Sequence, residues 1–241
     1  MSVFSVFAHL VEQLADLLQP LFRGSAAAAA IVLFTALVRL LVHPLSRAAA
    51  RGRRAQAALR PRIAELRGKY ARDPERLQKA VLDLHAKERV SPLSGCLPGL
   101  LQLPAFFLLY HLFSSPTVGG RSNELLAHRL FAAPLDGRWA DALGAGGVFG
   151  DAGLVYLGLF AIVFAVAAFN YRLAKRTRAN NPVAVGAGGG EQVPGLGAVA
   201  RVMPFMSFFT LVTVAVVPLA GALYVLTSTA WTAVERAALD R

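Results

Sequence analysis

Residues 25–45 form an apolar run that is long enough to cross a lipid bilayer as one helix. The run reads SAAAAAIVLFTALVRLLVHPL, and about 20 apolar residues span the hydrocarbon core. Its one arginine, Arg39, is also its only residue with a permanent charge. A guanidinium at that depth costs from about 3 to more than 10 kcal/mol, depending on how far it reaches toward the surface. Such a residue usually has a function, so Arg39 is the first candidate functional residue.

The rest of the chain has the same character. It is 56% hydrophobic and 16% charged, whereas a soluble domain is about 25% charged. Four more apolar runs follow the first, at 93–113, 152–173, 202–217 and 218–236. The sequence therefore predicts an all-α polytopic membrane protein with five transmembrane helices.

The basic residues predict the orientation of these helices. Residues 46–90 hold 13 of the 25 Lys and Arg side chains, and the glycine-rich loop 174–201 is also basic. Residues 114–150 balance three arginines against three acidic residues. By the positive-inside rule, the two basic loops face the cytoplasm, the loop 114–151 is extracytoplasmic, the N-terminus is outside and the C-terminus is inside.

Segment 46–92 has the pattern of a cytoplasmic helical hairpin. Apolar residues recur at three- and four-residue spacing on both sides of a break at Asp73-Pro74. Asp73 suits an N-cap and Pro74 suits the first helical turn. We expect two antiparallel helices of about 24 and 17 residues.

For the remaining segments, the sequence pattern predicts only the type of structure. Residues 1–24 have the spacing of an amphipathic helix that lies in the membrane interface. A short helix capped by Ser122 is expected at Ser122–Phe131, and mobile loops are expected at Gly144–Gly150 and Ala184–Gly197. Residues 237–241 form a short cytoplasmic tail.

Polar residues inside the apolar runs are the candidate site. Thr35, Arg39 and His43 are four residues apart and share one helix face. Polar groups at membrane depth face one another or a water-filled cavity. The full candidate set is Arg39, Thr35, His43, Gln102, Asn170, Thr210, Thr213, Tyr224 and Ser228.

Each of these residues also has a simpler interpretation. Arg39 is about 9 Å from the inner end of its run, so its side chain could extend to the cytoplasmic headgroups. His43 could be an interface residue. Gln102 and the hydroxyl residues could form hydrogen bonds between helices.

Motifs of enzymes and cofactor sites do not occur in the sequence. There is no HExxH, no phosphate-binding glycine loop with a lysine, and no GxSxG. The single cysteine, Cys96, excludes an intrachain disulfide and a CxxC metal site. We expect a protein that is not an enzyme and that needs no cofactor or metal.

Three strings in the chain resemble a known family. They are VRLLVHPL at Val38–Leu45, SPLSGCLPGLLQLPAFFLLY at Ser91–Tyr110, and PLAGALY at Pro218–Tyr224. The second string matches almost throughout the pattern of the YidC/Oxa/Alb family of membrane protein insertases. The third string resembles a motif in the family's last helix, but Val225, which follows Tyr224, is a departure, because relatives have a tryptophan there.

The resemblance implies a fold and an activity. Five helices would enclose a hydrophilic groove that opens to the cytoplasm and to lipid. Arg39 would attract the polar or acidic tail of a client, and the client's apolar segment would then move into the bilayer. The implied partners are newly made membrane proteins, membrane lipids and, for delivery, the Sec translocon, the ribosome or the signal recognition particle pathway, with no specific nucleic-acid target. The implied place is a bacterial plasma membrane, in the compact form typical of Gram-positive bacteria.

Two other functions are consistent with the same residues. A small-solute or anion channel would use Arg39 as its anion site, although no internal repeat or second intramembrane charge supports it. A scaffold would bind anionic lipid or a partner through segment 46–92 alone, and Arg39 would then be dispensable.

Overall fold

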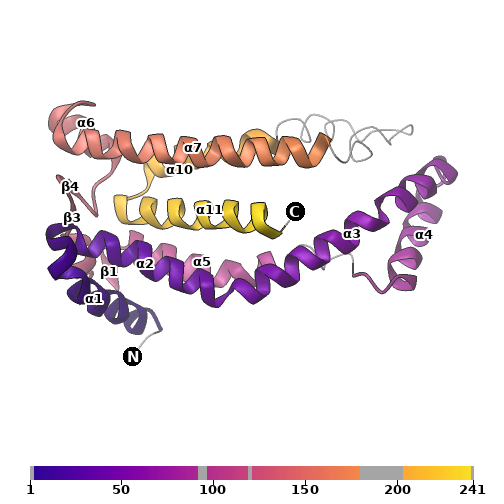
Figure 1. Cartoon of the computed structure of the whole chain (residues 1–241), viewed down its shortest axis with the longest axis horizontal. Helices are drawn as coiled ribbons and strands as arrows, with labels where there is room; N and C mark the ends of the chain where they lie inside the picture. The colour runs from indigo at the N-terminus through magenta and orange to yellow at the C-terminus, as the bar shows by residue number, and fades with distance from the viewer. Residues whose placement is uncertain (1–2, 92–96, 119–120, 180–202, 240–241) are drawn as a thin grey trace. The chain divides into compact units, whose positions relative to one another are not determined.

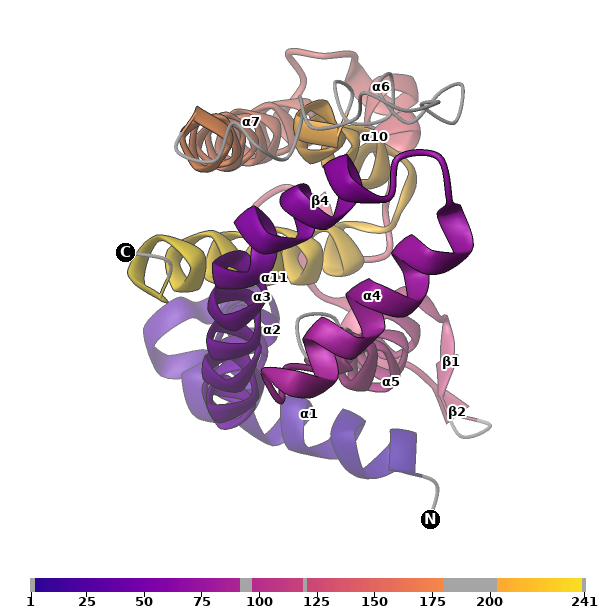
Figure 2. The same ribbon diagram turned by 90° about the vertical axis from the view of Figure 1, so that its right-hand side faces the viewer.

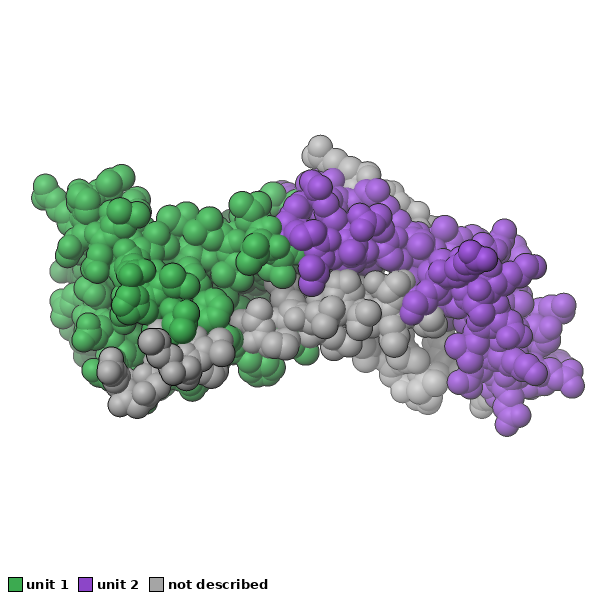
Figure 3. All heavy atoms as spheres, turned by 90° about the horizontal axis from the view of Figure 1, so that it is seen from below, with its two compact units in different colours: residues 1–42, 103–168, 208–234 green, residues 43–102, 169–207, 235–241 purple. Residues whose placement is uncertain are grey.

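The computed structural model describes residues 3–91, 97–118, 121–179 and 203–239 of the 241-residue chain (Figure 1). The described residues are mostly helical, with two short antiparallel sheets, β1–β2 and β3–β4. The chain divides into two compact units (Figure 3). Unit 1 comprises residues 1–42, 103–168 and 208–234, and unit 2 comprises residues 43–102, 169–207 and 235–241.

The elements follow one another along the chain in a simple order. The helices are α1 (Val3–Phe22), α2 (Ala26–Leu41), α3 (His43–Lys69), α4 (Pro74–Lys87), α5 (Leu97–Ser114), α6 (Trp139–Gly146), α7 (Asp151–Ala179), α10 (Phe209–Val216) and α11 (Leu219–Leu239). The 3-10 helices are η1 (Arg23–Ser25), η2 (Glu124–Ala127) and η3 (Met203–Phe208). The strands are β1 (Thr117–Val118), β2 (Arg121–Ser122), β3 (Arg129–Leu130) and β4 (Ala133–Pro134).

In unit 1, α1 lies along α2 (Figures 1 and 2). Five consecutive alanines begin α2, so the two helices pack closely, and Val11 and Ile31 are fully buried. The ring of Phe7 meets the ring of Phe34 edge to face at 5.9 Å. The side of α1 that carries Val11 is therefore covered by protein.

The described residues between α5 and α7, 115–118 and 121–150, belong to unit 1 and are held by side-chain hydrogen bonds. The side chain of Asn123 is buried and donates hydrogen bonds to the carbonyls of Leu112, at 2.7 Å, and Ser115, at 3.1 Å. The hydroxyl of Tyr156 donates to the Gly137 carbonyl at 2.6 Å. These bonds satisfy buried carbonyls that would otherwise destabilise the fold.

The same segment holds the start of α11. The first amides of a helix have no partner within it. Here the Leu219 amide donates to the Gly137 carbonyl and the Ala220 amide donates to the Leu135 carbonyl, each at 2.9 Å. Pro218 precedes them and has no amide to satisfy. The turn between α10 and α11 is thus fastened by backbone hydrogen bonds.

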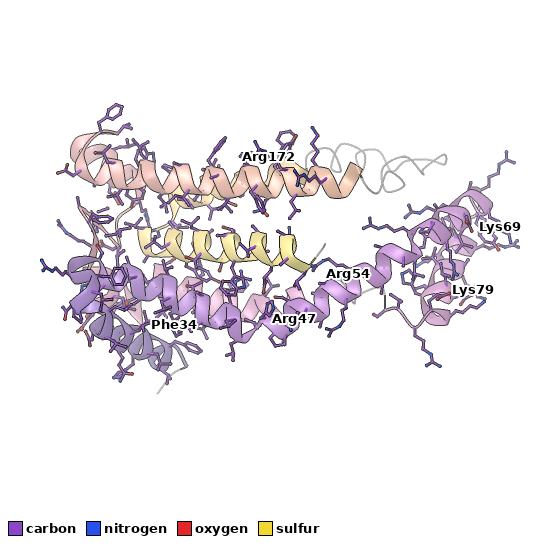
Figure 4. All side chains as sticks on the ribbon, in the orientation of Figure 1. Phe34, Arg47, Arg54, Lys69, Lys79 and Arg172 are labelled. Carbon is purple, nitrogen blue, oxygen red and sulfur yellow. The ribbon has the colours of Figure 1, made fainter. Side chains whose placement is uncertain are left out.

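Unit 2 contains the hairpin of α3 and α4, which lie side by side (Figure 2). Asp73 caps α4 as its sequence predicts, since its side chain accepts from the Arg76 amide at 3.0 Å. Arg62 pairs with Glu88 across the hairpin. Arg54, labelled in Figure 4, donates to the Leu239 carbonyl at the end of α11.

Two helical stretches within the described residues are long and apolar enough to cross a membrane. They are Val6–Leu41 and Asp151–Arg176, judged by length and composition alone. Only 28% of the apolar window in Asp151–Arg176 is buried, whereas a core helix of a soluble protein would be mostly buried. Its exposed apolar side chains are those expected of a helix that contacts lipid. The five-helix arrangement stays a prediction.

Several predictions of local structure are wrong. Ser122–Phe131 is not one helix: it contains the end of β2, the 3-10 helix η2 and strand β3. The buried Asn123 side chain bonds neighbouring carbonyls and so favours a turn over a helix. The predicted mobile stretch Gly144–Gly150 begins within α6. The glycine-rich stretch Ala184–Gly197 lies outside the described residues.

Other boundaries move for identifiable reasons. Within the described part of the predicted helix 202–217, Met203–Phe208 is a 3-10 helix and Phe209–Val216 is α-helical. The hairpin helices have 27 and 14 residues. The first begins early, at His43, because Pro44 suits a first turn, and the second ends before Arg89, whose φ is 54°.

Candidate functional site

In unit 1, Arg39 of α2 lies close to one face of α11. It is half-buried and is the only charged residue of α2. It is near enough to Tyr224 to act on it electrostatically. Tyr224 is 3% exposed, and its ring lies 6.0 Å from the ring of Phe113. The permanent charge of α2 therefore acts on a buried phenol.

That face of α11 carries polar groups at helical spacing. Tyr224, Ser228 and Trp231 are four and three residues apart, which places them on one side of the helix. The Ser228 hydroxyl lies near the Tyr224 hydroxyl. Ser228 is 4% exposed, so its polar atom is shut away from bulk solvent.

Unsatisfied polar atoms gather on this face. Within the described residues, three buried side-chain atoms have no hydrogen-bond partner, namely Ser114 Oγ, Ser228 Oγ and Trp231 Nε1. Two of the three belong to the face of α11 that carries Tyr224. A buried polar atom without a partner destabilises a fold by about 1–3 kcal/mol. Such atoms are retained where water or a bound polar group completes the bonding.

The other predicted residues of unit 1 have more local roles. Thr35 is fully buried, and its hydroxyl donates to the Ile31 carbonyl of its own helix at 2.7 Å. Thr213 likewise donates to the Phe209 carbonyl at 3.3 Å, and Thr210 is half-buried on the same helix. Bonds of this kind let a hydroxyl lie among apolar neighbours without a distant partner.

In unit 2, His43 joins two charged side chains. Its Nδ1 lies 2.6 Å from Glu235 Oε1, and its Nε2 accepts from Arg47 Nε at 3.0 Å. A neutral imidazole with its proton on Nδ1 satisfies both contacts. The side chain of His43 is 26% exposed and that of Glu235 is 11% exposed. The pair thus ties the start of α3 to the last turns of α11.

Two predicted residues are less well defined. Asn170 is half-buried on α7, within unit 2. Gln102 belongs to α5, and its side chain lies outside the described part of the structure. The candidate residues are thus divided between the units: Thr35, Arg39, Thr210, Thr213, Tyr224 and Ser228 belong to unit 1, and His43, Gln102 and Asn170 belong to unit 2.

Sequence reasoning missed Glu235. It was assigned to the inner end of the last apolar run and given no role. Its position in the sequence could have revealed it. Glu235 continues the 4-3-4 spacing of Tyr224, Ser228 and Trp231, so it lies on the same polar face of α11.

In the described ranges, no cluster of three or more His, Cys, Asp or Glu side chains could hold a metal ion.

Comparison with known proteins adds independent findings. A model of the 60Kd inner membrane protein family matches residues 18–241. A protein of Clostridium perfringens named membrane protein insertase YidC is 38% identical over 94 residues, covering 39% of this chain and 40% of the relative. One of the same name from Chlorobium limicola is 31% identical over 156 residues, covering 63% of this chain and 25% of the relative.

A third relative of that name, from Anaeromyxobacter dehalogenans, is 43% identical over 81 residues, which is 34% of this chain and 15% of the relative. In each of these comparisons, the matched segment spans 40% or less of the relative's own length.

Proposed function

Since the chain belongs to the 60Kd inner membrane protein family, we propose that it is a membrane protein insertase and chaperone of a bacterial inner membrane. Its clients are newly made membrane proteins whose polar tails must pass the bilayer. Five helices enclose a hydrophilic groove that opens toward the cytoplasm. The protein does no covalent chemistry and uses no cofactor.

One observation carries this proposal. A permanent cation, Arg39, lies half-buried in an apolar helix and acts electrostatically on the buried Tyr224 of α11. A membrane protein that served only as a scaffold would have no use for this charge. A groove that admits water and polar client segments has one, because water solvates the cation and an acidic client segment pairs with it.

The physics of insertion follows from this arrangement. Two opposite charges 4 Å apart attract by roughly 4 kcal/mol in surroundings of intermediate polarity, compared with about 1 kcal/mol in water. Arg39 thus draws an acidic client tail part of the way into the bilayer. The client's apolar segment then leaves sideways into lipid, and burial of about 20 apolar residues supplies tens of kcal/mol.

The other polar residues have supporting roles in the proposal. Thr35, His43, Gln102, Asn170, Thr210, Thr213, Tyr224 and Ser228 line the groove or support its walls. The N-terminus is outside and the C-terminus is cytoplasmic, as the basic segments 46–90 and 174–201 favour. The exposed cations of α3 and α4 receive clients from the ribosome, the signal recognition particle pathway or the Sec translocon.

Substitution of Arg39 tests the proposal. We expect Arg39→Ala to lower insertion of a client with an acidic translocated tail about tenfold, equivalent to a loss of ~1.4 kcal/mol of attraction. Arg39→Lys should retain part of the activity, because it keeps the charge and loses the planar fork. Protease protection of the client in vesicles that contain the purified protein measures both.

The control is Arg51→Ala, which removes one exposed positive charge from α3. It should leave insertion unchanged, because the other exposed cations of α3 can substitute for this one. A client with an uncharged tail should be affected less by Arg39→Ala than the acidic client. Equal protection of the acidic client by Arg39→Ala and by the wild type would refute the role of the arginine and favour the interpretation that it anchors the helix at the interface.

A further inference from the structure

A short stretch of unit 1, residues 129–137, is bonded to three of its helices. It contains the strands β3 and β4 and the residues that follow them (Figure 1). Ala133 and Leu135 of this stretch are fully buried, so it belongs to the core of unit 1. We refer to residues 129–137 as the brace.

The first end of the brace is fixed to the start of α2. Strand β3 contacts both η1 and α2. In the turn between β3 and β4, the Phe131 amide donates to Ser25 Oγ of η1 at 3.4 Å. The backbone of Phe131 has a φ of 53°, which is uncommon for a bulky residue. Such a conformation persists where the surrounding structure fixes it.

The second end of the brace is fixed to α11 and α7 through one atom. The Gly137 carbonyl accepts from the Leu219 amide of α11 at 2.9 Å and from the Tyr156 hydroxyl of α7 at 2.6 Å. A carbonyl oxygen has two lone pairs, so it can accept both bonds. The Leu135 carbonyl adds a third bond, from the Ala220 amide at 2.9 Å.

The position of that carbonyl depends on a glycine. A methyl group added at Gly137 would lie 2.9 Å from Pro134 Cγ and 3.2 Å from the Pro134 carbonyl oxygen. The chain therefore turns back on itself too closely for a larger residue. Any side chain at Gly137 would move its carbonyl away from the two donors.

The brace also accounts for how Arg39 comes near Tyr224. Helices α2 and α11 run in the same direction (Figure 1). Arg39 is about 21 Å along from Ser25, and Tyr224 is about 7.5 Å along from Leu219, at 1.5 Å per residue. Helices that started at one level would leave the two residues about 14 Å apart along the axes. Residues 131–137 can extend by up to about 20 Å, which is enough to offset the start of α11.

We propose that the brace sets the spacing of α2 and α11, and that Tyr156 is a positioning residue for client insertion. Its hydroxyl ties the brace to α7 as a third support. The start of α11 then stays fixed relative to α2, and Arg39 stays near Tyr224. The role of Tyr156 rests on the proposed function, because it acts through the capture of acidic clients by Arg39.

Distances between spin labels test the spacing in the purified full-length protein. The labels are attached to Leu37→Cys on α2 and Val234→Cys on α11, both exposed, in a Cys96→Ser background. We expect a single narrow distance distribution with the native brace. Tyr156→Phe, which removes only the hydroxyl, should broaden it. Gly137→Ala should shift it further, because the methyl group displaces the shared carbonyl.

Two matched variants are the controls. Gly158→Ala also adds a methyl group to a glycine, on α7, but the group would meet no atom within 4 Å. Tyr70→Phe removes a phenol hydroxyl from unit 2. Both should keep the label distances of the wild type. Thermal melting verifies that every variant is folded.

Insertion of two clients tests the link to function. Tyr156→Phe should lower the insertion of a client with an acidic tail, relative to one with an uncharged tail, about threefold, as for partial loss of one neutral hydrogen bond. A residue that only stabilised the fold would lower the insertion of both clients equally.

Two outcomes overturn the proposal. Unchanged label distances in both Tyr156→Phe and Gly137→Ala would show that the brace does not set the spacing. Changed distances with an unchanged ratio of the two clients would show that the spacing does not act on insertion. Failure of the proposed function gives a different result: Arg39→Ala would then insert the acidic client normally, whereas changed label distances would still support the brace.

Discussion

Helices α2 and α3 follow one another in the chain but use polar residues in opposite ways. Helix α2 has 16 residues and one charge, Arg39, which lies near buried groups of α11. Helix α3 has 27 residues and carries seven arginines, one lysine and one glutamate. Most of these charged side chains are exposed. The loss of one polar group near α2 should therefore have a large effect, whereas the charges of α3 can substitute for one another.

The difference follows from the solvent that each helix faces. An exposed ion pair gains about 0–1 kcal/mol, because water screens it and already solvates both partners. At membrane depth no water takes over when a partner is lost, so close fit and hydrogen bonding decide the energy. If this contrast holds, equivalent substitutions in buried and in exposed surroundings should have unequal effects. Two pairs of variants test it, each with one buried and one exposed member, and a third set of variants probes the exposed charges of the hairpin.

The largest expected effect comes from a pair of helical glycines. A methyl group added at Gly221 of α11 would lie 2.8 Å from Ser114 Oγ, whereas one added at Gly68 of α3 would meet no atom within 4 Å. We expect Gly221→Ala to destabilise the protein by about 1–3 kcal/mol through overpacking. We expect Gly68→Ala to stabilise it by about 0.5–1 kcal/mol. Thermal unfolding in detergent measures both.

A double variant verifies the cause of the Gly221 effect. Ser114→Ala removes the hydroxyl oxygen that the new methyl group would meet, and that oxygen has no hydrogen-bond partner to lose. Gly221→Ala combined with Ser114→Ala should therefore recover most of the lost stability. A double variant no more stable than Gly221→Ala alone would mean that backbone contacts, and not this oxygen, set the approach of α5 and α11.

An intermediate effect is expected at Glu235. Its carboxylate lies 2.6 Å from His43 Nδ1 and its side chain is 11% exposed, whereas Glu65 of α3 is exposed. We expect Glu235→Gln to destabilise the last turns of α11 by about 1 kcal/mol, as for one charge-assisted hydrogen bond. Glu65→Gln should change little. Amide hydrogen exchange near the end of α11 distinguishes them, and equal exchange in both variants would show that the His43 contact is dispensable.

The smallest effect is expected in the hairpin. Arg62 pairs with Glu88, but the two side chains are 58% and 36% exposed, so Arg62→Ala should cost less than about 0.5 kcal/mol. Reversal of four exposed cations together, at Arg60, Arg62, Arg67 and Lys69, should lower client delivery from ribosomes while the melting temperature stays close to that of the wild type. Normal delivery by this variant would contradict the proposed receiving role of the hairpin.

Local sequence signals predicted much of the secondary structure but not its fine boundaries. Asp73 and Pro74 mark the start of α4 because capping depends on residues next to each other in the chain. The prediction of a helix at Ser122–Phe131 was wrong because the Asn123 side chain donates hydrogen bonds to the carbonyls of Leu112 and Ser115. Both partners lie outside the segment, so its own composition does not reveal these bonds. Glu235 was missed because its partner, His43, is 192 residues away in the chain.

The sequence by itself showed that the chain has long apolar runs, that one of them contains an arginine, and which segments are basic. Hydrophobicity and charge are properties of each residue, so the free-energy cost of placing Arg39 in hydrocarbon can be estimated from the sequence alone. Only the tertiary structure decided what surrounds that arginine: Tyr224 close by, and on the same face of α11 a serine and a tryptophan with unmet bonds. Unmet hydrogen bonds depend on which atoms meet across the fold, and no single stretch of chain contains that information.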